Sequence, residues 1–474
     1  MTDAASPMAM PAVAPPPDAW DVQTDVLVIG AGAAGLVAGL RALEAGAETL
    51  VLEREPKLSG STSMSSGFVP APGTRWQRAH DIDDDPARFA ADIQKKAANG
   101  AHPGIVATVT SAIGPALEWT ADQHGLEWDV LTGFLYSGHT RHRMHAVPER
   151  TGQGLITRLG AAADAAGLPC VTQARATCLH MDGDRAAGIT VERPDGTLET
   201  IGAKAIVLAC NGYGGNRALV ERHIPEIADG VYHGHPGNTG DAILWGQQIG
   251  AASRDLTGYQ GHGNLAHPHG ILITWALMME GGIQVNAHGK RFSNEHEGYS
   301  EQGVKVLAQP SGIAWSIYDA RLHELGLQFP DYQLAVQAGA VRRGDSDDLA
   351  AQIGVPADAL AQTLGETRTA AMTGATDQFG RDFSGAPPLG DDLFAIRVTG
   401  ALFHTQGGLD IDSQARVCRP DGAAFDNLFA VGGAACGVSG NRVEGYLSGN
   451  GLLTAVGLGW IAGRAAALAA GKSP

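Results

Sequence analysis

Cysteine, aromatic residues and long apolar runs are all scarce in this chain of 474 residues. Aromatic residues make up 6 %, and no run approaches 18 apolar residues, so we expect no transmembrane segment. The cysteines form no CxxC pair, which favours free thiols in a reducing compartment, and the absence of CxxCH excludes a covalent c-type haem. The five scattered cysteines are Cys170, Cys178, Cys210, Cys418 and Cys436.

Basic residues are also few, with 33 Lys and Arg against 50 Asp and Glu and a net charge of −17. An acidic surface repels phosphate backbones and anionic lipids, which argues against a nucleic-acid or membrane-surface partner.

The N-terminus lacks the basic region and the continuous apolar core of a signal peptide. We therefore expect residues 1–21 to be a flexible tail and the protein to be cytoplasmic.

Glycine, in contrast, is abundant, at 65 of 474 residues, or roughly twice its usual share. The glycines follow no collagen-like period, and hydrophobic residues make up 44 %, which together exclude a fibre, a coiled coil and a disordered chain. Surplus glycine of this kind indicates tight turns and places where the backbone approaches a ligand closely.

One glycine cluster follows the first apolar run of the chain. Residues 24–29 (TDVLVI) have the continuous apolar character of a buried parallel strand and lead into Gly30, Gly32 and Gly35. A helix of small residues follows, and a second strand ends at Glu53, 18 residues after Gly35. This pattern predicts a βαβ unit that holds a dinucleotide pyrophosphate at the helix N-terminus and ribose hydroxyls at the acid. The alternative is a glycine turn without a ligand.

The segment after Glu53 is small and polar, reading SGSTSMSSG from Ser59 to Gly67. A flexible linker would have the same composition. Its position favours a segment that lies against a cofactor, which is common in FAD enzymes and not needed in NAD enzymes.

Further along, residues 152–167 have helical spacing, and strand-like segments run from 170 to 210. Residues from about 257 to 402 have fewer strong strands and more histidine and glycine. Strand-like segments then return, and a terminal helix closes the chain. We therefore predict a dinucleotide fold that is split by an inserted second domain.

Several motifs, in this order, resemble the flavoprotein family of fumarate reductase, succinate dehydrogenase and 3-ketosteroid dehydrogenases, with the ketosteroid branch as the closest. They are DVLVIGAGAAGLVAG, SGSTSMSSG, AIVLACNGYGGN, NTGDAILWG, GGIQVNAHGKRFSNE, FHTQGGLDID and GNGL. The resemblance implies an α/β fold, with a Rossmann-like FAD-binding domain at 22–256 and 403–474 and an inserted α+β capping domain at 257–402. Ser61 stands where succinate dehydrogenases carry their flavin-linking histidine, so FAD is expected to be non-covalent.

Eighteen residues are implied as FAD contacts: Gly30, Gly32, Ala33, Ala34, Gly35, Glu53, Arg54, Ser61, Thr62, Ser66, Gly67, Cys210, Asn211, Gly212, Gly432, Gly433, Asn450 and Leu452. Two of these places depart from the family. Cys210 and Asn211 replace a usual Thr-Gly, and Gly433 stands where many relatives have a glutamate.

The arginines that fumarate reductases use on dicarboxylates are also missing. Tyr299 occupies the place of the catalytic arginine, and Tyr446 that of a second substrate arginine. Trp275 and Met278 stand where the proton-relay glutamate and arginine are found. The resemblance thus argues against reduction of a dicarboxylate.

Tyrosines at these two places resemble the 3-ketosteroid dehydrogenases, and Tyr-x-Ser-Gly resembles their 4-dehydrogenase branch. The implied catalytic residues are Tyr299, Tyr446, Ser448 and Gly449, and the implied substrate-binding residues are His262, His404 and Trp275. Desaturation of a ketone needs a base for the α-proton and donors for the carbonyl oxygen, whereas a tyrosine has a pKa near ~10 and needs neighbours to lower it. Which tyrosine is the base stays open, and either could instead be an ordinary core or surface residue.

The sequence therefore predicts FAD-dependent desaturation of a cyclic ketone, either a 3-ketosteroid or a smaller cyclohexanone. The alternative is a fumarate-reductase-like reductase of an activated alkene, and a third hypothesis is a flavin-binding protein without catalysis. With one dinucleotide fingerprint, NAD(P)H has no evident site, and oxygen, a quinone or a redox protein are the candidate electron acceptors.

The segment GHTRHRMH, from Gly138 to His145, could suggest a metal or an anion site. Its arginines would oppose a cation, so we predict no metal and favour a solvated or substrate-edge loop. If the substrate carries a carboxylate, Arg141, Arg143 or Arg442 is the candidate partner.

Overall fold

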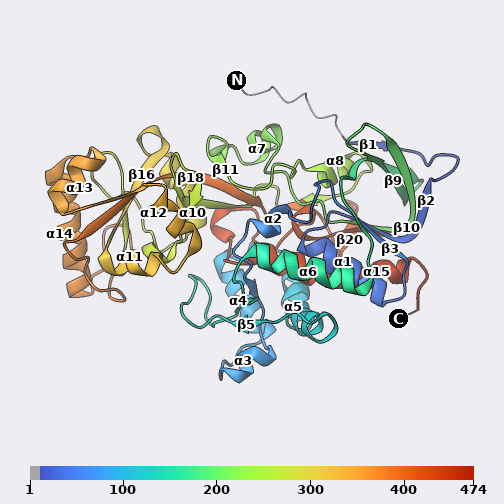
Figure 1. Cartoon of the computed structure of the whole chain (residues 1–474), viewed down its shortest axis with the longest axis horizontal. Coiled ribbons are helices and arrows are strands. Elements are labelled where there is room, and N and C mark those ends of the chain that lie inside the picture. Colours follow the sequence, from blue (N-terminus) through green and yellow to red (C-terminus); the bar gives the residue numbers. More distant parts are fainter. Residues whose placement is uncertain (1–10, 474) are drawn as a thin grey trace. The chain divides into compact units, whose positions relative to one another are not determined.

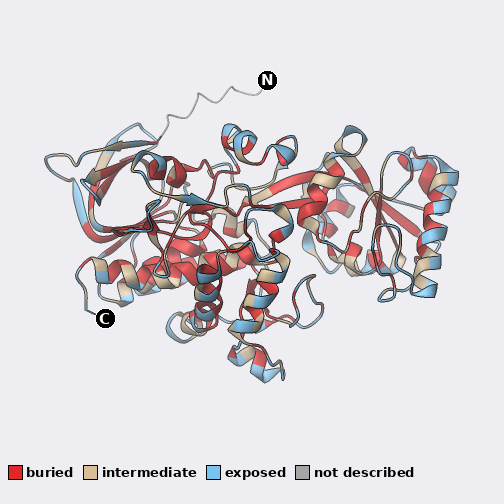
Figure 2. Cartoon of the chain, turned by 180° about the vertical axis from the view of Figure 1, so that it is seen from behind, coloured by how far each residue is buried: buried red, intermediate tan, exposed pale blue. Residues whose placement is uncertain are grey.

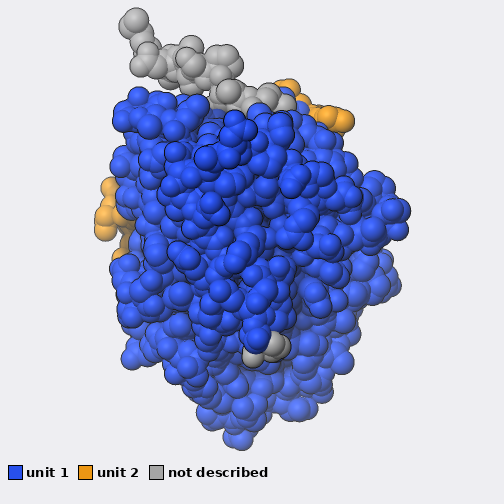
Figure 3. Space-filling view, turned by 90° about the vertical axis from the view of Figure 1, so that its right-hand side faces the viewer, with its two compact units in different colours: residues 1–219, 234–259, 404–474 blue, residues 220–233, 260–403 orange. Residues whose placement is uncertain are grey.

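The computed structural model describes residues 11–473, which form two compact units that are described separately (Figures 1 and 3). Unit 1 contains the described residues up to Leu219, together with Gly234–Tyr259 and the chain from His404. Unit 2 contains Val220–His233 and Gln260–Phe403. Figure 2 shows buried residues along the strands of both units and exposed residues on the outer helices.

The composition of unit 2 differs from the predicted single insertion at 257–402. Val220–His233, which we assigned to the FAD domain, belongs to unit 2. The physical reason is backbone pairing: β11 (Val231–Tyr232) lies parallel to β18 (Leu393–Thr405) in the sheet of that unit.

Unit 1 is built on a mixed sheet with parallel central strands. β2 (Val22–Ile29) lies between β10 (Leu198–Leu208) and β3 (Thr49–Leu52), and all three run in the same direction. Residues 26–29 are all buried, as an apolar run covered on both faces predicts. The other strands of this sheet are β1 (Ala12–Ala14), β7 (Cys170–Val171), β8 (Arg175–Asp182), β9 (Arg185–Glu192), β20 (Arg416–Cys418) and β21 (Ala424–Ala430).

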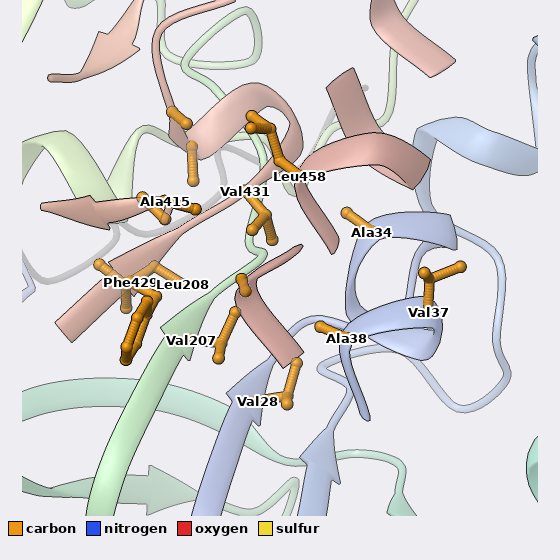
Figure 4. Close-up of a cluster of buried hydrophobic side chains, with 14 of the residues drawn as sticks. Val28, Ala34, Val37, Ala38, Val207, Leu208, Ala415, Phe429, Val431 and Leu458 are labelled. Atoms are coloured by element: carbon orange, nitrogen blue, oxygen red, sulfur yellow. The ribbon is translucent and has the colours of Figure 1, made fainter. Parts of the chain in front are cut away.

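Two helices of small residues cover this sheet, α1 (Ala33–Glu44) and α15 (Asn450–Ala469). A Cβ atom at Gly459 would lie 2.6 Å from the carbonyl oxygen of Ala34, so the two helices touch through their backbones. Figure 4 shows their side chains meeting those of β2, β10 and β21 in one apolar cluster. By length and hydropathy alone α15 could cross a bilayer, but 61 % of its apolar stretch is buried inside the protein, as in a core helix.

The remaining elements of unit 1 are short or peripheral. The helices are α2 (Gly60–Ser63), α3 (Arg75–Ala79), α4 (Pro86–Lys96), α5 (Pro103–His124), α6 (Gly152–Ala166), α8 (Asp241–Gln248), η3 (Gly432–Ala434) and η4 (Val443–Gly445). Two small sheets contain β4 (Val69–Pro70), β5 (Asp129–Val130) and β6 (Met144–Ala146), and β12 (Ser253–Arg254) with β19 (Gly408–Leu409). All five cysteines are free thiols.

The predicted flexible tail at 1–21 is wrong for its second half. β1 adds to the sheet edge parallel to β8, and His180 donates through Nδ1 to the carbonyl oxygen of Pro15 at 2.7 Å. The Trp20 ring fills the space above Gly188 and Gly202, where added Cβ atoms would lie 2.4 and 2.8 Å from it. Backbone pairing and the packing of one aromatic ring against two glycines therefore order this segment. Residues 1–10 lie outside the described residues.

Unit 2 contains a largely antiparallel sheet with helices packed against it, and the predicted α/β fold with an α+β capping domain is confirmed. Its long strand β18 pairs with β16 (Ile313–Asp319) over seven residues of each strand. The other strands are β13 (Tyr259–Ala266), β14 (Ile271–Leu272), β15 (Ile283–Val285) and β17 (Val341–Gly344). The helices are α9 (Ala276–Met279), α10 (Tyr299–Leu307), α11 (Ala320–Gly326), α12 (Pro330–Gln337), α13 (Ser346–Ile353) and α14 (Ala357–Thr373), with η1 (Pro225–Ile227) and η2 (Pro310–Gly312); α7 (Arg217–His223) spans the unit boundary.

A buried ion-pair network explains the RFSNE motif of unit 2. The Glu295 carboxylate is fully buried and accepts from Arg291 Nη2 at 2.6 Å and from Arg381 Nη1 at 2.8 Å. Arg291 also pairs with Asp377. Burial alone would raise the pKa of Glu295, but the two guanidinium groups and the Gln284 N–H hold it at about 2. Both arginines therefore form ion pairs in the interior of this unit.

Replacing Glu295 by glutamine is expected to lower the free energy of unfolding by about 3–5 kcal/mol near pH 7, because two buried cations lose their shared anion. The carboxylate stabilises the fold above its unfolded pKa of 4.5, and this advantage is lost as the pH falls towards about 2. Urea unfolding of the E295Q and wild-type proteins between pH 7 and pH 2 should show their difference shrinking below pH 4.5.

The matched control is Glu297→Gln, which removes a half-exposed carboxylate that pairs with Lys305. Its effect should stay within about 1 kcal/mol. A Glu295→Gln protein as stable as this control would show that the network contributes little.

Candidate active site

The glycine turn after β2 has three glycines with three different surroundings. Gly30 has a φ of +106°, and a Cβ atom there would lie 2.5 Å from the carbonyl oxygen of Ala209. A Cβ atom at Gly35 would lie 1.8 Å from the carbonyl oxygen of Gly30, so helix and turn are in backbone contact. At Gly32 the only neighbour within 4 Å would be Thr62 Oγ1, at 3.5 Å. The first and third glycines thus serve packing, and the second keeps the turn open.

Polar groups surround this turn and hold it in place. Glu53 is buried and accepts from the Ala31 N–H at 3.1 Å and the Glu55 N–H at 2.9 Å. Thr62 Oγ1 accepts from the Ala33 N–H at 3.0 Å. The N-cap residue of α1, Gly32, has no side chain to cap the helix, and Thr62 takes up only the first N–H, so the positive end of the helix is available to an anion. An open turn, a helix N-terminus and a buried acid fit a dinucleotide.

The polar segment after Glu53 meets the residues that follow β10. Ser61 Oγ accepts from Asn211 Nδ2 at 2.8 Å and from Asn238 Nδ2 at 2.9 Å. Asn211 Oδ1 in turn accepts from the Gly212 N–H at 2.8 Å and bonds to Nε2 of His404 at 2.8 Å. Asn238 was not among our predicted site residues, although it lies in the NTGD motif that carried part of the resemblance.

The two departures from the family occupy one space. A Cβ atom at Gly433 would lie 2.0 Å from Asn211 Oδ1 and 2.9 Å from His404 Nε2. A side chain at 433 and an asparagine at 211 therefore exclude each other, and the glycine compensates for the asparagine. Neighbouring Cys210 stays a thiol, since burial raises its pKa to about 12.

Five other residues that were predicted to contact the cofactor also lie in unit 1, and their surroundings differ. Arg54 donates to the carbonyl oxygen of Gly237 at 3.0 Å. Gly67 has a φ of +72° and lies against the Thr151 carbonyl, while Ser66 is exposed. Gly432 lies beside Ala34 at the start of α1, and Leu452 packs on the core.

Both ring nitrogens of His404 bind protein atoms, which argues against its predicted contact with substrate. Nε2 bonds to Asn211, and Nδ1 accepts from Gln406 Nε2 at 2.8 Å. Burial lowers the pKa of His404 to about 4, so the ring is neutral at pH 7. His404 therefore belongs to a hydrogen-bond network that includes Gln406, a residue the sequence analysis missed.

Tyr446, Ser448 and Gly449 form the loop between η4 and α15. Tyr446 and Ser448 are buried, and Gly449 caps α15 with a φ of +87°. His139 Nε2 donates to the carbonyl oxygen of Ser448 at 3.0 Å and so anchors this loop.

His139 belongs to the histidine- and arginine-rich segment, whose predicted solvation is wrong at its centre. Arg143 is fully buried and donates to Asp84 at 2.9 Å and to Asp92 at 2.6 Å. It also bonds to Nδ1 of His139 at 3.2 Å. Arg143 is therefore no free partner for a substrate carboxylate, because two acids on sequence-distant segments pair with it. Among residues 11–473 no group of three possible metal ligands gathers.

Tyr299, His262 and Trp275 meet within unit 2. His262 stacks on Tyr299 with ring centroids 4.8 Å apart and on Phe403 at 5.2 Å, and Trp275 meets its edge at 5.8 Å. We call these four residues the aromatic group. Tyr299, at the start of α10, is half-buried, and it lies in the other unit from Tyr446.

One backbone contact determines the tautomer of His262. Its Nδ1 accepts from the Asn264 N–H at 3.1 Å, so the neutral ring carries its proton on Nε2. Burial, together with His233, lowers the pKa of His262 to about 3. At pH 7 His262 is therefore a neutral hydrogen-bond donor.

Known proteins resemble this chain over most of its length. A family model described as FAD binding domain matches residues 25–452. Ifc3 of Shewanella frigidimarina, named as a probable fumarate reductase, is 30 % identical over 94 % of this chain and 75 % of its own length. A solved structure of a flavocytochrome c3 fumarate reductase in its open conformation has a TM-score of 0.81 at 28 % identity, covering 95 % of this chain and 79 % of that one.

Two ketone dehydrogenases are also similar. The 4-oxocyclohexanecarboxylate 2-dehydrogenase of Sinomonas cyclohexanicum is 25 % identical and covers 86 % of this chain and 87 % of its own. The 3-ketosteroid-Δ4-(5α)-dehydrogenase of Rhodococcus jostii RHA1 shares the fold, with a TM-score of 0.77 at 24 % identity over 97 % of this chain and 100 % of that one. These identities lie below that of Ifc3, so they do not support our placement closest to the ketosteroid branch. The chain belongs to the FAD-binding flavoprotein family that includes the fumarate reductases, and it is an FAD-dependent oxidoreductase that acts on CH–CH bonds.

Proposed function

We propose that this protein desaturates a cyclic ketone to the α,β-unsaturated ketone. The aromatic group of unit 2 carries the proposal. It stacks the phenol of Tyr299 on the neutral imidazole of His262 and contains no cationic side chain. Such groups suit an uncharged carbonyl, whereas a dicarboxylate needs cations. The two arginines buried in unit 2, Arg291 and Arg381, are both paired with Glu295.

Bound FAD would supply the hydride acceptor for the β-hydrogen. The chain's own residues would move the proton and bind the oxygen. Tyr299 and Tyr446 are assigned the transfer of the α-proton. Ser448 and the backbone N–H near Gly449 are the candidate donors to the carbonyl oxygen, which gains negative charge as the α-proton leaves.

Reduction of an activated alkene is the second candidate, and the comparisons favour it. Ifc3 and flavocytochrome c3 are both named as fumarate reductases and exceed the ketone dehydrogenases in identity. Against it stand the tyrosines at the places of two family arginines.

The substrate is proposed to be a cyclohexanone-type ketone or a 3-ketosteroid, and the electron acceptor to be oxygen, a quinone or a redox protein. The similarity to a 4-oxocyclohexanecarboxylate dehydrogenase supports a monocyclic ketone.

Anaerobic absorbance of the bound flavin distinguishes these functions. The protein would be mixed with cyclohexanone, 4-oxocyclohexanecarboxylate, a 3-ketosteroid or succinate, and the dye-reduced protein with fumarate or cyclohexenone. Bleaching by a ketone is the expected result, and the fastest ketone identifies the substrate class. Rapid reoxidation by fumarate without bleaching by any ketone would favour the reductase, and no response at all would favour a flavoprotein without catalysis.

Non-covalent FAD is a further expected result. Ser61 offers a hydroxyl that already accepts two amide hydrogen bonds, and it lacks the nucleophilic ring nitrogen of a flavin-linking histidine. Acid precipitation of the yellow protein should leave all of the flavin absorbance in the supernatant. Colour that stays with the washed pellet would contradict the proposal.

A further inference from the structure

Residues 447–450, in the loop between η4 and α15, form a type II β-turn. The Asn450 N–H donates to the carbonyl oxygen of Leu447 at 3.1 Å, and Gly449 has a φ of +87° and a ψ of −5°. These are the angles of the third residue of a type II turn, where a positive φ favours glycine. The peptide between Ser448 and Gly449 is therefore the central peptide of the turn.

The C=O and N–H groups of this central peptide point in opposite directions, because the peptide is planar and trans. His139 Nε2 donates to the carbonyl oxygen of Ser448 at 3.0 Å. The N–H of Gly449 therefore points away from His139, and no hydrogen-bond acceptor among the described residues takes it. Gly449 is also partly exposed, as a residue that donates to a ligand has to be.

A type I turn over the same four residues would have the central peptide turned over. Its second residue has a ψ near about −30° in place of about +120°, and its third residue has a φ near about −90°. Glycine adopts both signs of φ readily, so Gly449 alone does not choose between the two turns. In the type I turn the Gly449 N–H would point towards His139. A donor at His139 therefore stabilises the type II turn, and an acceptor there would stabilise the type I turn.

Arg143 determines that His139 is a donor towards the turn. An arginine can only donate, and Arg143 Nη1 donates to Nδ1 of His139 at 3.2 Å, so this ring nitrogen carries no proton. Burial, together with Arg143, lowers the pKa of His139 to about 4, so the ring is neutral at pH 7 and its proton is on Nε2. The guanidinium group of Arg143 is itself held by Asp84 and Asp92.

We propose that His139 is a positioning residue that selects the turn in which the Gly449 N–H faces the substrate carbonyl. The inference rests on the proposed function, which assigns this N–H to the carbonyl oxygen. Because the oxygen gains negative charge as the α-proton leaves, an oriented donor stabilises the transition state more than it stabilises the bound ketone. His139 should therefore affect the limiting rate of flavin bleaching more than it affects ketone binding.

Two substitutions separate the N–H group of His139 from its ring. His139→Phe keeps an aromatic ring beside Phe89 and removes the donor, whereas His139→Gln loses the ring and keeps an N–H donor. At saturating ketone we expect bleaching to slow roughly tenfold to a hundredfold in His139→Phe and to stay within about threefold of the wild type in His139→Gln. The ketone concentration that gives half the limiting rate should change less than about threefold in both variants.

His145→Phe is the matched control. His145 is another buried histidine of the same segment, and its Nε2 bonds to the Thr74 hydroxyl at 2.8 Å and not to the turn. The substitution removes a ring with the same hydrogen-bonding capacity, so it should lower stability and leave the bleaching rate close to that of the wild type.

Solution NMR of protein labelled with ¹⁵N in its histidines gives a second reading that needs no turnover. The signal that is missing from His139→Gln should show a proton on Nε2 and none on Nδ1. A proton on Nδ1 would overturn the proposal, even if His139→Phe failed to fold. So would a wild-type rate in His139→Phe, or a rate in His139→Gln as low as that of His139→Phe. A wild-type protein that no ketone bleaches would contradict the proposed function, whereas the tautomer tests the role of His139 in the turn without it.

Discussion

Replacing Tyr446 or Tyr299 by phenylalanine is expected to slow flavin bleaching by the ketone by about a hundredfold to ten-thousandfold, with FAD still bound. The reason is that each change removes a phenolic O–H that the proposal assigns to proton transfer, and such transfers contribute about that much to enzymatic rates. Because the same proton must move in both directions, reoxidation of the reduced flavin by the corresponding enone should slow to a similar extent. Stopped-flow absorbance in both directions measures the two effects.

Tyr318→Phe is the control for these variants. Tyr318 is a fully buried phenol of unit 2 that bonds to the Tyr332 hydroxyl at 2.8 Å and has no part in the aromatic group. Its loss should change stability while leaving the bleaching rate nearly unaltered. Near-normal rates in both Tyr299→Phe and Tyr446→Phe would refute the assignment, and a slow rate in one alone would identify that tyrosine as the base.

Alanine at Gly32 and at Gly35 should separate FAD binding from folding. At Gly32 the new methyl group meets only Thr62 Oγ1 at an ordinary 3.5 Å, and the φ of −72° suits alanine. The protein should fold, but the methyl group stands where backbone must approach the pyrophosphate. Loss of one or two charge-assisted hydrogen bonds would weaken FAD binding roughly tenfold to a hundredfold or more. Titration of deflavinated protein with FAD measures this.

At Gly35 the same change forces a methyl group to within 1.8 Å of the Gly30 carbonyl oxygen, and both partners are backbone. Overpacking of this kind should cost about 3 kcal/mol or more in the free energy of unfolding, measured with urea in the absence of FAD. Gly365→Ala, on α14 with nothing within 4 Å, should not destabilise. A Gly35→Ala protein as stable as this control, or a Gly32→Ala protein with wild-type FAD affinity, would contradict the division of roles.

Asn211 and Gly433 both differ from the residues that are usual in the family, and the two differences are coupled in space. Both residues were implied as FAD contacts by the resemblance, and Asn211 Oδ1 occupies the space that a side chain at 433 would need. The asparagine also orients His404, so this departure leaves one ring nitrogen of His404 bonded to protein and not to a substrate. The two sites therefore have to be exchanged together in any experiment that restores the family pattern.

The dinucleotide turn could be predicted from the residues alone, since Gly30, Gly32, Gly35 and Glu53 belong to one βαβ unit and their spacing reflects local backbone geometry. The presence of a second domain could be predicted in the same way, because the motifs that indicate it lie in continuous stretches of chain. These features depend on residues that are close together along the chain.

The surroundings of several other residues could not be predicted, because they are formed by segments that are distant in the sequence. Arg143 is buried because it forms ion pairs with Asp84 and Asp92. The sequence of residues 138–145 does not predict these two partners. Val220–His233 joins unit 2 through pairing with β18, and β1 is ordered by an edge of the sheet more than 160 residues away. The tautomers of His404 and His262 likewise depend on hydrogen-bond partners that folding brings to each ring. The ion pairing of a charged side chain and the tautomer of a histidine depend on the groups within a few ångströms. For these residues, those groups become neighbours only when the chain folds.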